Sequence, residues 1–217
     1  MLVYHFLNKK YGLEAIKNRR LKISRINELN DPFEFRGINL KNKSLRPAFR
    51  KMKDELNQNR GLHCFSGNWE NPVLWSHYAN KHRGLCLGFD VPDDLLAQVE
   101  YRDKLIEPDI LRSNDRKAKQ QFSETLIKIK FAHWSYEDEY RMFARLEDQD
   151  SQSGFYFSDF SKKLNLAKII VGAESQITRS DLNNALGNLR DSVEIIKARI
   201  AFQNFKVTPQ ENDKLWK

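Results

Sequence analysis

The chain has 217 residues, of which 40% are hydrophobic and 30% charged, and it carries a formal net charge of +8. This composition argues against intrinsic disorder, and a chain of this length can bury an adequate core without disulfides or a structural metal. We therefore expect one globular domain over residues 1–217. The start of the chain lacks the features of a secretory signal, and no apolar stretch approaches the ~20 residues that cross a bilayer. We expect a cytoplasmic protein that does not bind membranes.

The first half of the chain alternates short strands with helices. Apolar runs predict strands at residues 2–6, 21–24, 61–66 and 84–90, and apolar spacing of three to four residues predicts helices at 11–19 and 46–57. Asn71 and Pro72 have the chemistry of an N-cap and a first helical residue, so a further helix is expected over 72–79. Between these elements, Asn30-Asp31-Pro32 predicts a turn, because proline disfavours the helical conformation of the preceding residue.

The second half is richer in strands. Strands are predicted at 99–102, 140–145, 154–157, 168–171, 193–200 and 202–207, with helices at 108–130 and 181–186. Because strands outnumber helices and often follow one another directly, we predict an α+β fold rather than a doubly wound one. Its sheet should be mixed, mostly antiparallel and flanked by helices.

Four short stretches, at residues 4–5, 30–34, 63–84 and 134–141, concentrate polar and aromatic side chains. Their histidines lack the H-x-x-x-H or H-E-x-x-H spacing of a metal site, so no metal is expected. The chain contains neither a G-x-S-x-G sequence nor a Gly-rich phosphate loop, which argues against serine hydrolases and the common NTP-binding folds. Cys64 and Cys86 lie in apolar runs, and we predict both to be buried, reduced thiols.

Glu137 and Glu139 are two residues apart at the start of a predicted strand. Strand side chains alternate, so the two carboxylates are expected on the same face. Such proximity raises the pKa of one acid, which suits a general base or a partner for sugar hydroxyls. The alternative is a surface turn whose acids pair with Arg141 and Arg145.

Together these stretches resemble a widespread bacterial family of unknown function. Its signature runs N-D-P-F-E, C-F-S, W-S-H-Y-A followed by H-x-G, and W-x-Y-E-x-E-Y-R, here at residues 30–34, 64–66, 75–79, 82–84 and 134–141. Members are similar to proteins associated with abortive phage infection, so the resemblance implies a role in phage defence. Beyond the residues discussed elsewhere, it singles out Asn30, Asp31, Glu34, His82 and Arg141.

A looser resemblance is to ADP-ribosyltransferase-like folds, whose opening is similar to the first strand, short helix and second strand expected here. In those enzymes a first-strand His or Arg contacts the NAD ribose, a Ser-bearing strand holds the nicotinamide, and a late Glu, often in E-x-E, hydrogen-bonds the ribose. The resemblance implies NAD, a small-molecule nucleotide, as cofactor, with Glu139 and Glu137 as catalytic residues. Phe65-Ser66-Gly67 offers one hydroxyl where such strands carry S-T-S. The implied cofactor-binding residues are Tyr4, His5, Ser66, Trp75, His77 and Tyr78.

The first hypothesis is therefore an NAD-dependent ADP-ribosyltransferase-like enzyme with a protein or nucleic-acid acceptor. It predicts a cleft that gathers His5, Asp31, Ser66, His77 and Glu139. The alternative is a nucleic-acid-binding or regulatory module that uses a basic face. Its candidate phosphate contacts are Arg46, Arg50, Lys51 and Lys53. A third interpretation assigns the Trp, Tyr and His side chains to core packing.

Overall fold

The computed structural model describes residues 1–108 and 115–216 and contains one large sheet of eight strands. The β10–β11 pair is parallel and the other neighbouring pairs are antiparallel. The predicted α+β class with a mixed, mostly antiparallel sheet is confirmed. In spatial order the strands are β12 (Val207–Pro209), β11 (Glu194–Ile200), β10 (Asn165–Val171), β4 (Leu85–Asp90), β1 (Leu2–Leu7), β3 (Arg60–Ser66), β8 (Glu139–Arg145) and β5 (Leu96–Gln98).

Two small sheets accompany the large one. β2 (Arg20–Ile23) pairs antiparallel with β9 (Tyr156–Asp159), and β6 (Glu100–Arg102) pairs parallel with β7 (Ile129–Phe131). The α-helices are α1 (Lys9–Asn18), α2 (Arg46–Asn59), α3 (Pro72–Tyr78), α4 (Arg116–Leu126) and α5 (Arg179–Leu186). A 3-10 helix over Ala132–Glu137 leads into β8.

The helix starts follow from local side-chain chemistry. The Asn71 side chain accepts a hydrogen bond from the amide of Val73, and Pro72 is the first helical residue of α3, as predicted. Asn8 caps α1 in the same way, and Thr178 forms a capping box with Asp181 at the start of α5. These caps satisfy backbone N–H groups that the first helical turn leaves unpaired.

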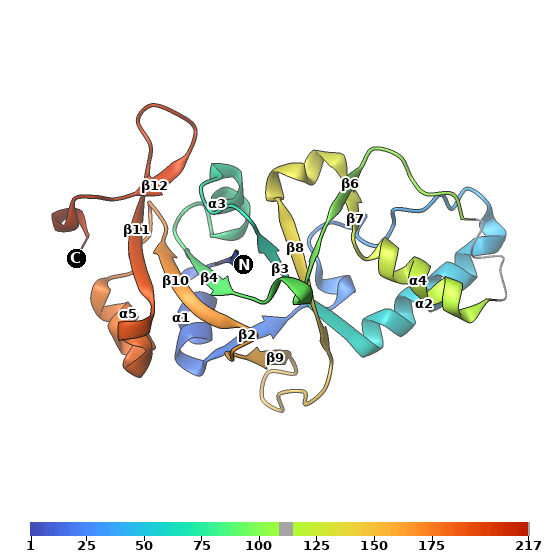
Figure 1. Cartoon of the computed structure of the whole chain (residues 1–217), viewed down its shortest axis with the longest axis horizontal. Coiled ribbons are helices and arrows are strands. Elements are labelled where there is room, and N and C mark those ends of the chain that lie inside the picture. Colours follow the sequence, from blue (N-terminus) through green and yellow to red (C-terminus); the bar gives the residue numbers. More distant parts are fainter. Residues whose placement is uncertain (109–114, 217) are drawn as a thin grey trace.

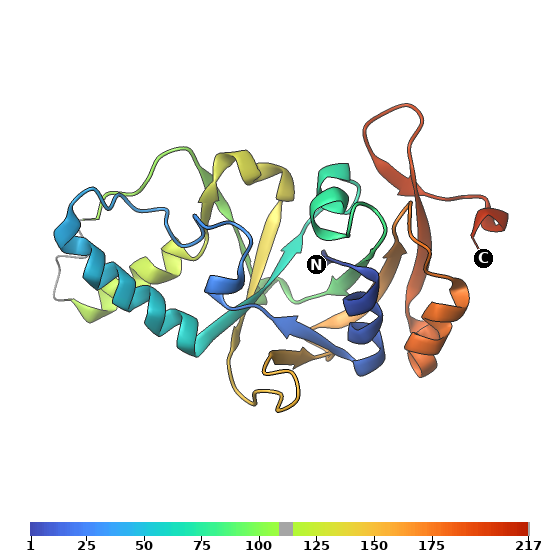
Figure 2. The same cartoon turned by 180° about the vertical axis from the view of Figure 1, so that it is seen from behind.

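Three apolar clusters hold the elements together. On one face of the sheet, Phe65, Leu87 and Ile169 pack with residues of α1 and α5, such as Ile16 and Leu182. On the opposite face, Trp75 and Ala79 of α3 pack on Cys86 and Ile170. A third cluster combines Leu62 of β3 with residues of α2, α4 and the segment around Phe35. Figure 1 shows α2 and α4 together at one end of the molecule, with α5 and the C-terminus at the other; Figure 2 shows the same arrangement from behind.

Two element predictions are wrong at their ends. The helix predicted over 108–130 ends at Leu126, and Ile129–Phe131 forms strand β7, while residues 109–114 lie outside the described residues. The strand predicted over 202–207 is confined to Val207–Pro209, and the preceding residues form a turn on which Phe202 and Phe205 are 92% and 96% exposed. The apolar residues that suggested a strand over 202–207 therefore lie mostly in the exposed turn of a protruding hairpin and not in a buried strand. In the described part of the chain, no helix is long and apolar enough to cross a membrane.

Candidate functional site

A cavity of about 180 Å³ lies over one end of the central strands. Its floor includes Tyr4 of β1, Ser66 of β3 and Glu139 of β8, which are direct neighbours across the sheet, Tyr4 opposite Ser66 and Ser66 opposite Glu139. Opposed residues of antiparallel strands project to the same face, so all three side chains lie on one side of the sheet. The sheet register thereby brings together residues 4, 66 and 139.

Three segments wall the cavity above this floor. α3 contributes Leu74 and Tyr78, which are four residues apart and therefore lie on one helical face. The turn at residues 30–34 contributes Asn30, Asp31 and Glu34, with a carboxylate oxygen of Asp31 accepting a hydrogen bond from the amide of Phe33. The 3-10 helix before β8 supplies Glu137 from its last residue. The non-helical turn predicted at 30–34 is confirmed.

Five buried charged side chains form a network beside the cavity. Each is at most 8% exposed, and they carry a formal charge of −1, from three carboxylates and two cations. Lys130 Nζ lies 2.5 Å from Glu137, 3.0 Å from Glu139 and 3.2 Å from Glu34. Arg141 donates to both oxygens of Glu34, at 2.8 and 2.9 Å, and to the carbonyl of Ile127 at 2.6 Å. Buried charges of this kind are tolerated because each is paired and hydrogen-bonded.

Glu139 is held by both cations of this network. Arg141 Nε donates to Glu139 Oε1 at 2.8 Å, and Lys130 Nζ donates to Oε2 at 3.0 Å. Burial alone would raise the pKa of Glu139, but the charge and hydrogen bonds of Arg141 and the charge of Lys130 outweigh it and lower that pKa to about 2. The alternative in which these acids pair with arginines is therefore correct for Glu139 and Arg141, although this ion pair is buried and not part of a surface turn. Arg145 instead lies near Glu147 on the surface.

Glu137 is the acid of the pair with the raised pKa. Burial is the main cause and nearby Glu139 adds to it, against the opposing effects of Lys130 and Tyr78. The Tyr78 hydroxyl donates to Glu137 Oε1 at 2.5 Å, and burial and the Glu137 charge raise the pKa of Tyr78. Two carboxylates at one site thus sit in different environments, which is the arrangement that separates acid and base roles.

Sequence reasoning missed two residues of the site. Lys130 stands between two apolar residues in a segment predicted as helical, and Tyr101 lies in a short predicted strand that carried no motif. The Tyr101 hydroxyl accepts a hydrogen bond from the backbone amide of Glu139 at 2.8 Å, and burial raises the pKa of Tyr101 to about 12. A lysine flanked by apolar residues was the available signal, since burial of a lysine requires paired acids.

Four of the five residues predicted to share a cleft do line this cavity: His5, Asp31, Ser66 and Glu139. The His5 ring Nδ1 lies 2.8 Å from the carbonyl oxygen of Cys64, and burial lowers the pKa of His5. The Ser66 hydroxyl donates to the carbonyl of Asn68 at 2.9 Å. Cys86 is a buried free thiol as predicted, whereas Cys64 is only half-buried because it borders the cavity.

His77, Trp75 and His82 do not line the cavity. His77 is exposed, with Nδ1 3.1 Å from the Tyr136 hydroxyl, so its predicted place in the cleft is wrong. Trp75 is fully buried, donates from Nε1 to the carbonyl of Trp69 at 2.6 Å and packs edge-on against Phe6, so it cannot stack on a ligand. These three positions lie on other faces of α3 or beyond its end, whereas positions 74 and 78 face the cavity.

His82 lies in a turn after α3 and not at the cavity. Its ring stacks on Trp75 with centroids 6.2 Å apart, and Nε2 lies 3.2 Å from the Ser76 hydroxyl. The backbone at Asn80, Lys81 and His82 has positive φ angles of 47°, 56° and 66°. Gly84 follows where any side chain would meet the carbonyl oxygen of Leu7, so the H-x-G motif has a structural explanation.

The four predicted phosphate contacts on α2 do not share one face. Arg46, Arg50 and Lys51 are exposed and line a groove of about 520 Å³ together with Asp54 and Glu55. Lys53 does not line that groove, and it is half-buried with a pKa that burial and the nearby Arg36 lower. In the described part of the chain, no group of three His, Cys, Asp or Glu side chains could hold a metal ion.

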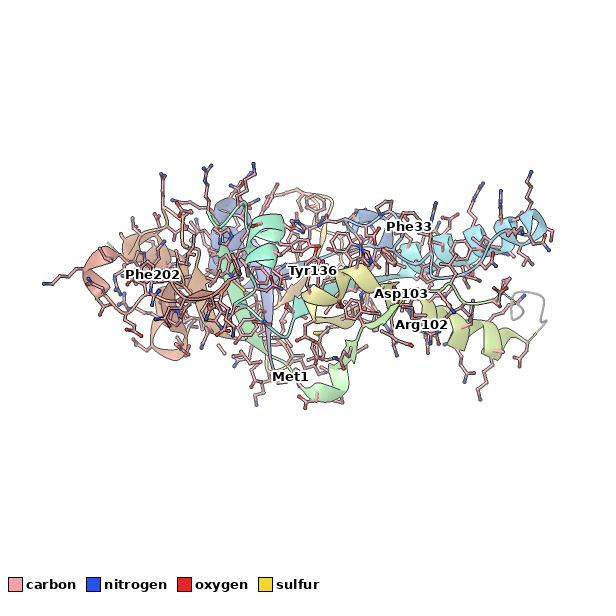
Figure 3. All side chains as sticks on the ribbon, turned by 90° about the horizontal axis from the view of Figure 1, so that it is seen from above. Met1, Phe33, Arg102, Asp103, Tyr136 and Phe202 are labelled. Atoms are coloured by element: carbon pink, nitrogen blue, oxygen red, sulfur yellow. The ribbon has the colours of Figure 1, made fainter. Side chains whose placement is uncertain are left out.

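The cavity lies in the middle of the molecule. Figure 3 shows Tyr136, whose neighbour Glu137 lines the cavity, near the middle of the long axis, with Phe202 in the left-hand part of the view. The Asn71 side chain donates to the Tyr136 carbonyl oxygen at 2.9 Å, which ties α3 to the 3-10 helix before β8. The site therefore joins elements that are far apart in the sequence.

Comparison with known families matches part of the chain to a described family. The family described as "Protein of unknown function (DUF2971)" matches residues 74–142, about a third of the chain. This segment runs from α3 to β8 and includes Tyr78, Lys130, Glu137, Glu139 and Arg141, so most of the charged network lies within it. No curated protein and no solved structure matches the chain.

Proposed function

We propose that the cavity binds NAD and that the chain is an ADP-ribosyltransferase-like enzyme. The observation that carries the proposal is the register of three adjacent strands, in which Tyr4, Ser66 and Glu139 are direct neighbours at the cavity. The sequence resemblance implies a first-strand His or Arg, a serine on a second strand and a late glutamate. Ser66 and Glu139 are the serine and the glutamate, and His5, the first-strand residue that the resemblance implies, lines the same cavity next to Tyr4. Strands far apart in the sequence supply all three to one cavity.

The charge of the cavity supports the same ligand. Its described walls hold more buried carboxylates than cations, because Asp31 adds to the network of charge −1 and is 8% exposed. Oxidised NAD carries a positively charged nicotinamide ring, and Tyr4, Phe6 and Tyr78 offer aromatic surface beside the acids. A cavity of about 180 Å³ is smaller than typical pockets for whole drug-sized ligands, so it would enclose the nicotinamide riboside end and leave the adenosine outside.

In the proposed reaction the bond between the ribose C1′ and the nicotinamide nitrogen breaks, and neutral nicotinamide leaves with the bonding electrons. An acceptor nucleophile then forms the new bond to C1′ and loses its proton. Glu139, ionised because of its low pKa, would stabilise the positive charge that develops on the ribose. Glu137, with its raised pKa, would take the proton of the acceptor. The acceptor is a protein or nucleic acid, and a role in phage defence forms part of the proposal.

The experiment measures NAD binding by ligand-observed NMR and nicotinamide release by chromatography. The wild type should bind NAD, and Ser66→Ala and Glu139→Gln should release nicotinamide at least roughly 10²-fold more slowly. Glu211→Gln, at an exposed position outside the cavity, is the matched control and should retain wild-type rates. Absence of both NAD binding and nicotinamide release in the wild type, with protein and nucleic-acid acceptors present, would reject the proposal.

A second candidate function is nucleic-acid binding through α2. The observation in its favour is the exposed groove of Lys43, Arg46, Arg50 and Lys51. Asp54 and Glu55 line the same groove, and their charge opposes that of a phosphate backbone. We therefore rank it below the NAD-binding function.

A further inference from the structure

Lys130 occupies a special place among the residues of the cavity. Within residues 1–108 and 115–216, it is the side chain that hydrogen-bonds to both Glu137, at 2.5 Å, and Glu139, at 3.0 Å. It is 7% exposed and lines the cavity, whereas Arg141 contacts Glu139 and Glu34 from behind and does not line it. Lys130 thus lies between the two carboxylates on the side that a ligand would meet.

The position of Lys130 follows from the small sheet that carries it. β7 pairs with β6 outside the large sheet, and the backbone amide of Glu100 donates to the carbonyl of Lys128 at 2.7 Å just before β7. The ammonium group also lies 5.2 Å from the Trp134 ring centroid. A separate sheet therefore positions the Lys130 ammonium group beside the acids at the start of β8. Burial restricts the movement of this side chain.

We propose that Lys130 is a positioning residue of this site, whose ammonium group bridges Glu137 and Glu139 and fixes the separation of their carboxylates at the cavity. Two buried carboxylates this close repel each other unless a cation lies between them. Arg141 cannot replace Lys130 in this role, because none of its hydrogen bonds reaches Glu137. The catalytic meaning of the bridge rests on the proposed function, but the bridge itself exists in the free protein.

The groups that face Lys130 come from every neighbouring element. They are Glu34 from the turn at 30–34, Tyr78 of α3 through Glu137, Tyr101 of β6, Trp134 and Glu137 of the 3-10 helix, and Glu139 of β8. Arg141 of β8 shares Glu34 and Glu139 with Lys130. Without Lys130, three buried carboxylates would face one cation, Arg141. The charged forms of Glu137 and Glu139 would then be less favourable, and their side chains would be free to move apart.

The test compares each carboxylate with and without Lys130. Carbon-13 NMR of labelled glutamate side chains follows the titration of Glu139 in the wild type and in Lys130→Met from pH 7 to below pH 2, so that the wild-type midpoint near pH 2 lies within the range. We expect its midpoint to rise by at least about one pH unit, a tenfold change in proton affinity. Lys206→Met is the matched control, because Lys206 pairs with Glu70 at 2.9 Å on the surface, and it should leave the midpoint unchanged.

If Lys130→Met does not fold, the comparison moves to a Glu137→Gln parent. Lys130→Met/Glu137→Gln keeps the wild-type charge of −1 in the network, since one cation and one carboxylate are lost together. Adding Lys130→Met to that parent should again raise the Glu139 midpoint. A midpoint that does not move in either background would overturn the bridge, whatever the result with NAD.

The catalytic part of the role has its own readout. For nicotinamide release from NAD, Lys130→Met should lower kcat by roughly tenfold or more with a small change in KM, because misplaced groups affect the transition state most. The acid limb of its pH profile should move to higher pH together with the Glu139 midpoint. A raised midpoint with unchanged kcat would overturn the positioning role. A wild type without NAD turnover rejects the proposed function, while the NMR comparison still decides the bridge.

Discussion

Arg141 binds both carboxylate oxygens of Glu34, at 2.8 and 2.9 Å, although the two residues are 107 positions apart in the chain. The contact fastens the turn at 30–34 to strand β8, where Glu139 begins the strand. The motif at residues 30–34 is thereby tied to the motif at residues 134–141. The pairing also means that the turn and the acids of the cavity depend on each other for stability.

Glu34→Ala should destabilise the fold strongly. The substitution leaves Arg141 and Lys130 with one partner fewer in a buried setting, and breaking a buried ion pair costs about 3–5 kcal/mol. Urea unfolding followed by circular dichroism measures the loss. Glu55→Ala is the control, since Glu55 lies 3.9 Å from Lys51 on the exposed face of α2 and such pairs contribute at most about 1 kcal/mol. Equal effects of the two substitutions would contradict a structural role for the Glu34–Arg141 pair.

Glu139→Gln should lose catalysis and retain a folded structure. Glutamine preserves the shape and some hydrogen bonds but removes the charge that would stabilise the transition state, so we expect a loss of roughly 10²-fold or more in NAD turnover per folded molecule. The melting temperature and turnover are measured on the same preparation. Because the charge of Glu139 also stabilises the fold, some fall in the melting temperature is expected in either case; a purely structural Glu139 would differ by preserving turnover per folded molecule.

The stability of the protein should fall in acid partly because of Glu139. Its pKa is about 2 in the folded protein and ordinary when unfolded, so the unfolded chain binds a proton more readily. The contribution is therefore complete above the unfolded pKa of about 4.3 and is lost as the pH falls through the folded pKa. Free energies of unfolding between pH 6 and pH 2 should decline less steeply in Glu139→Gln than in the wild type. Parallel curves would exclude this source of acid sensitivity.

His63 should add a second, higher window of acid sensitivity. Its side chain is 1% exposed, its Nε2 lies 2.8 Å from the Ser158 hydroxyl, and burial lowers its pKa to about 3. The unfolded histidine gains its proton near pH 6.5 and the folded one near pH 3, so stability is present at neutral pH and falls between those values by up to about 1.4 kcal/mol per pH unit. His63→Leu should flatten the curve in that window, and a curve of unchanged slope there would exclude His63 as the cause.

Any nucleic-acid binding should depend on only some of the four predicted phosphate contacts on α2. Arg46, Arg50 and Lys51 line one groove, so replacing the three with glutamine should reduce the slope of log affinity against log salt by about 0.9 for each phosphate that the variant no longer neutralises. Lys53→Gln should change the slope less, because Lys53 is half-buried away from the groove. Filter binding from low to physiological salt measures both. Identical slopes in all variants would remove α2 from consideration as a phosphate-binding surface.

Strand periodicity and turn chemistry were enough to predict the fold class and most of the elements, whereas the candidate cavity residues came mainly from the family resemblances. The register that unites Tyr4, Ser66 and Glu139 depends on pairing between distant strands, which no local pattern encodes. The faces of α3 were harder to predict, because a helix with polar and aromatic residues all round gives no signal for which face meets the sheet and which meets the cavity. His77 and Trp75 were misassigned for that reason.

The charged network was beyond sequence reasoning for a different cause. Lys130 and Glu137 have no charged partner within four residues of the sequence, and Lys130 is tolerated in the interior because three carboxylates surround it. Burial of Lys130 therefore could not be inferred until Glu34, Glu137 and Glu139 were known to meet at one point. Local propensity also favoured a helix through residue 130, and pairing with β6 overrides it.

Strands β3 and β8 carry side chains of both apolar regions, one on each face. Leu62 and Phe143 pack in the cluster of α2 and α4, while Phe65 and Met142 pack beside α1 and α5 on the other side. If either region unfolded, one face of β3 and β8 would become exposed to water, and the same two strands carry the other region on their opposite face. We therefore expect the chain to unfold in one cooperative transition, with a calorimetric enthalpy equal to the van't Hoff enthalpy. A ligand that binds at the cavity would stabilise both ends of the molecule at once.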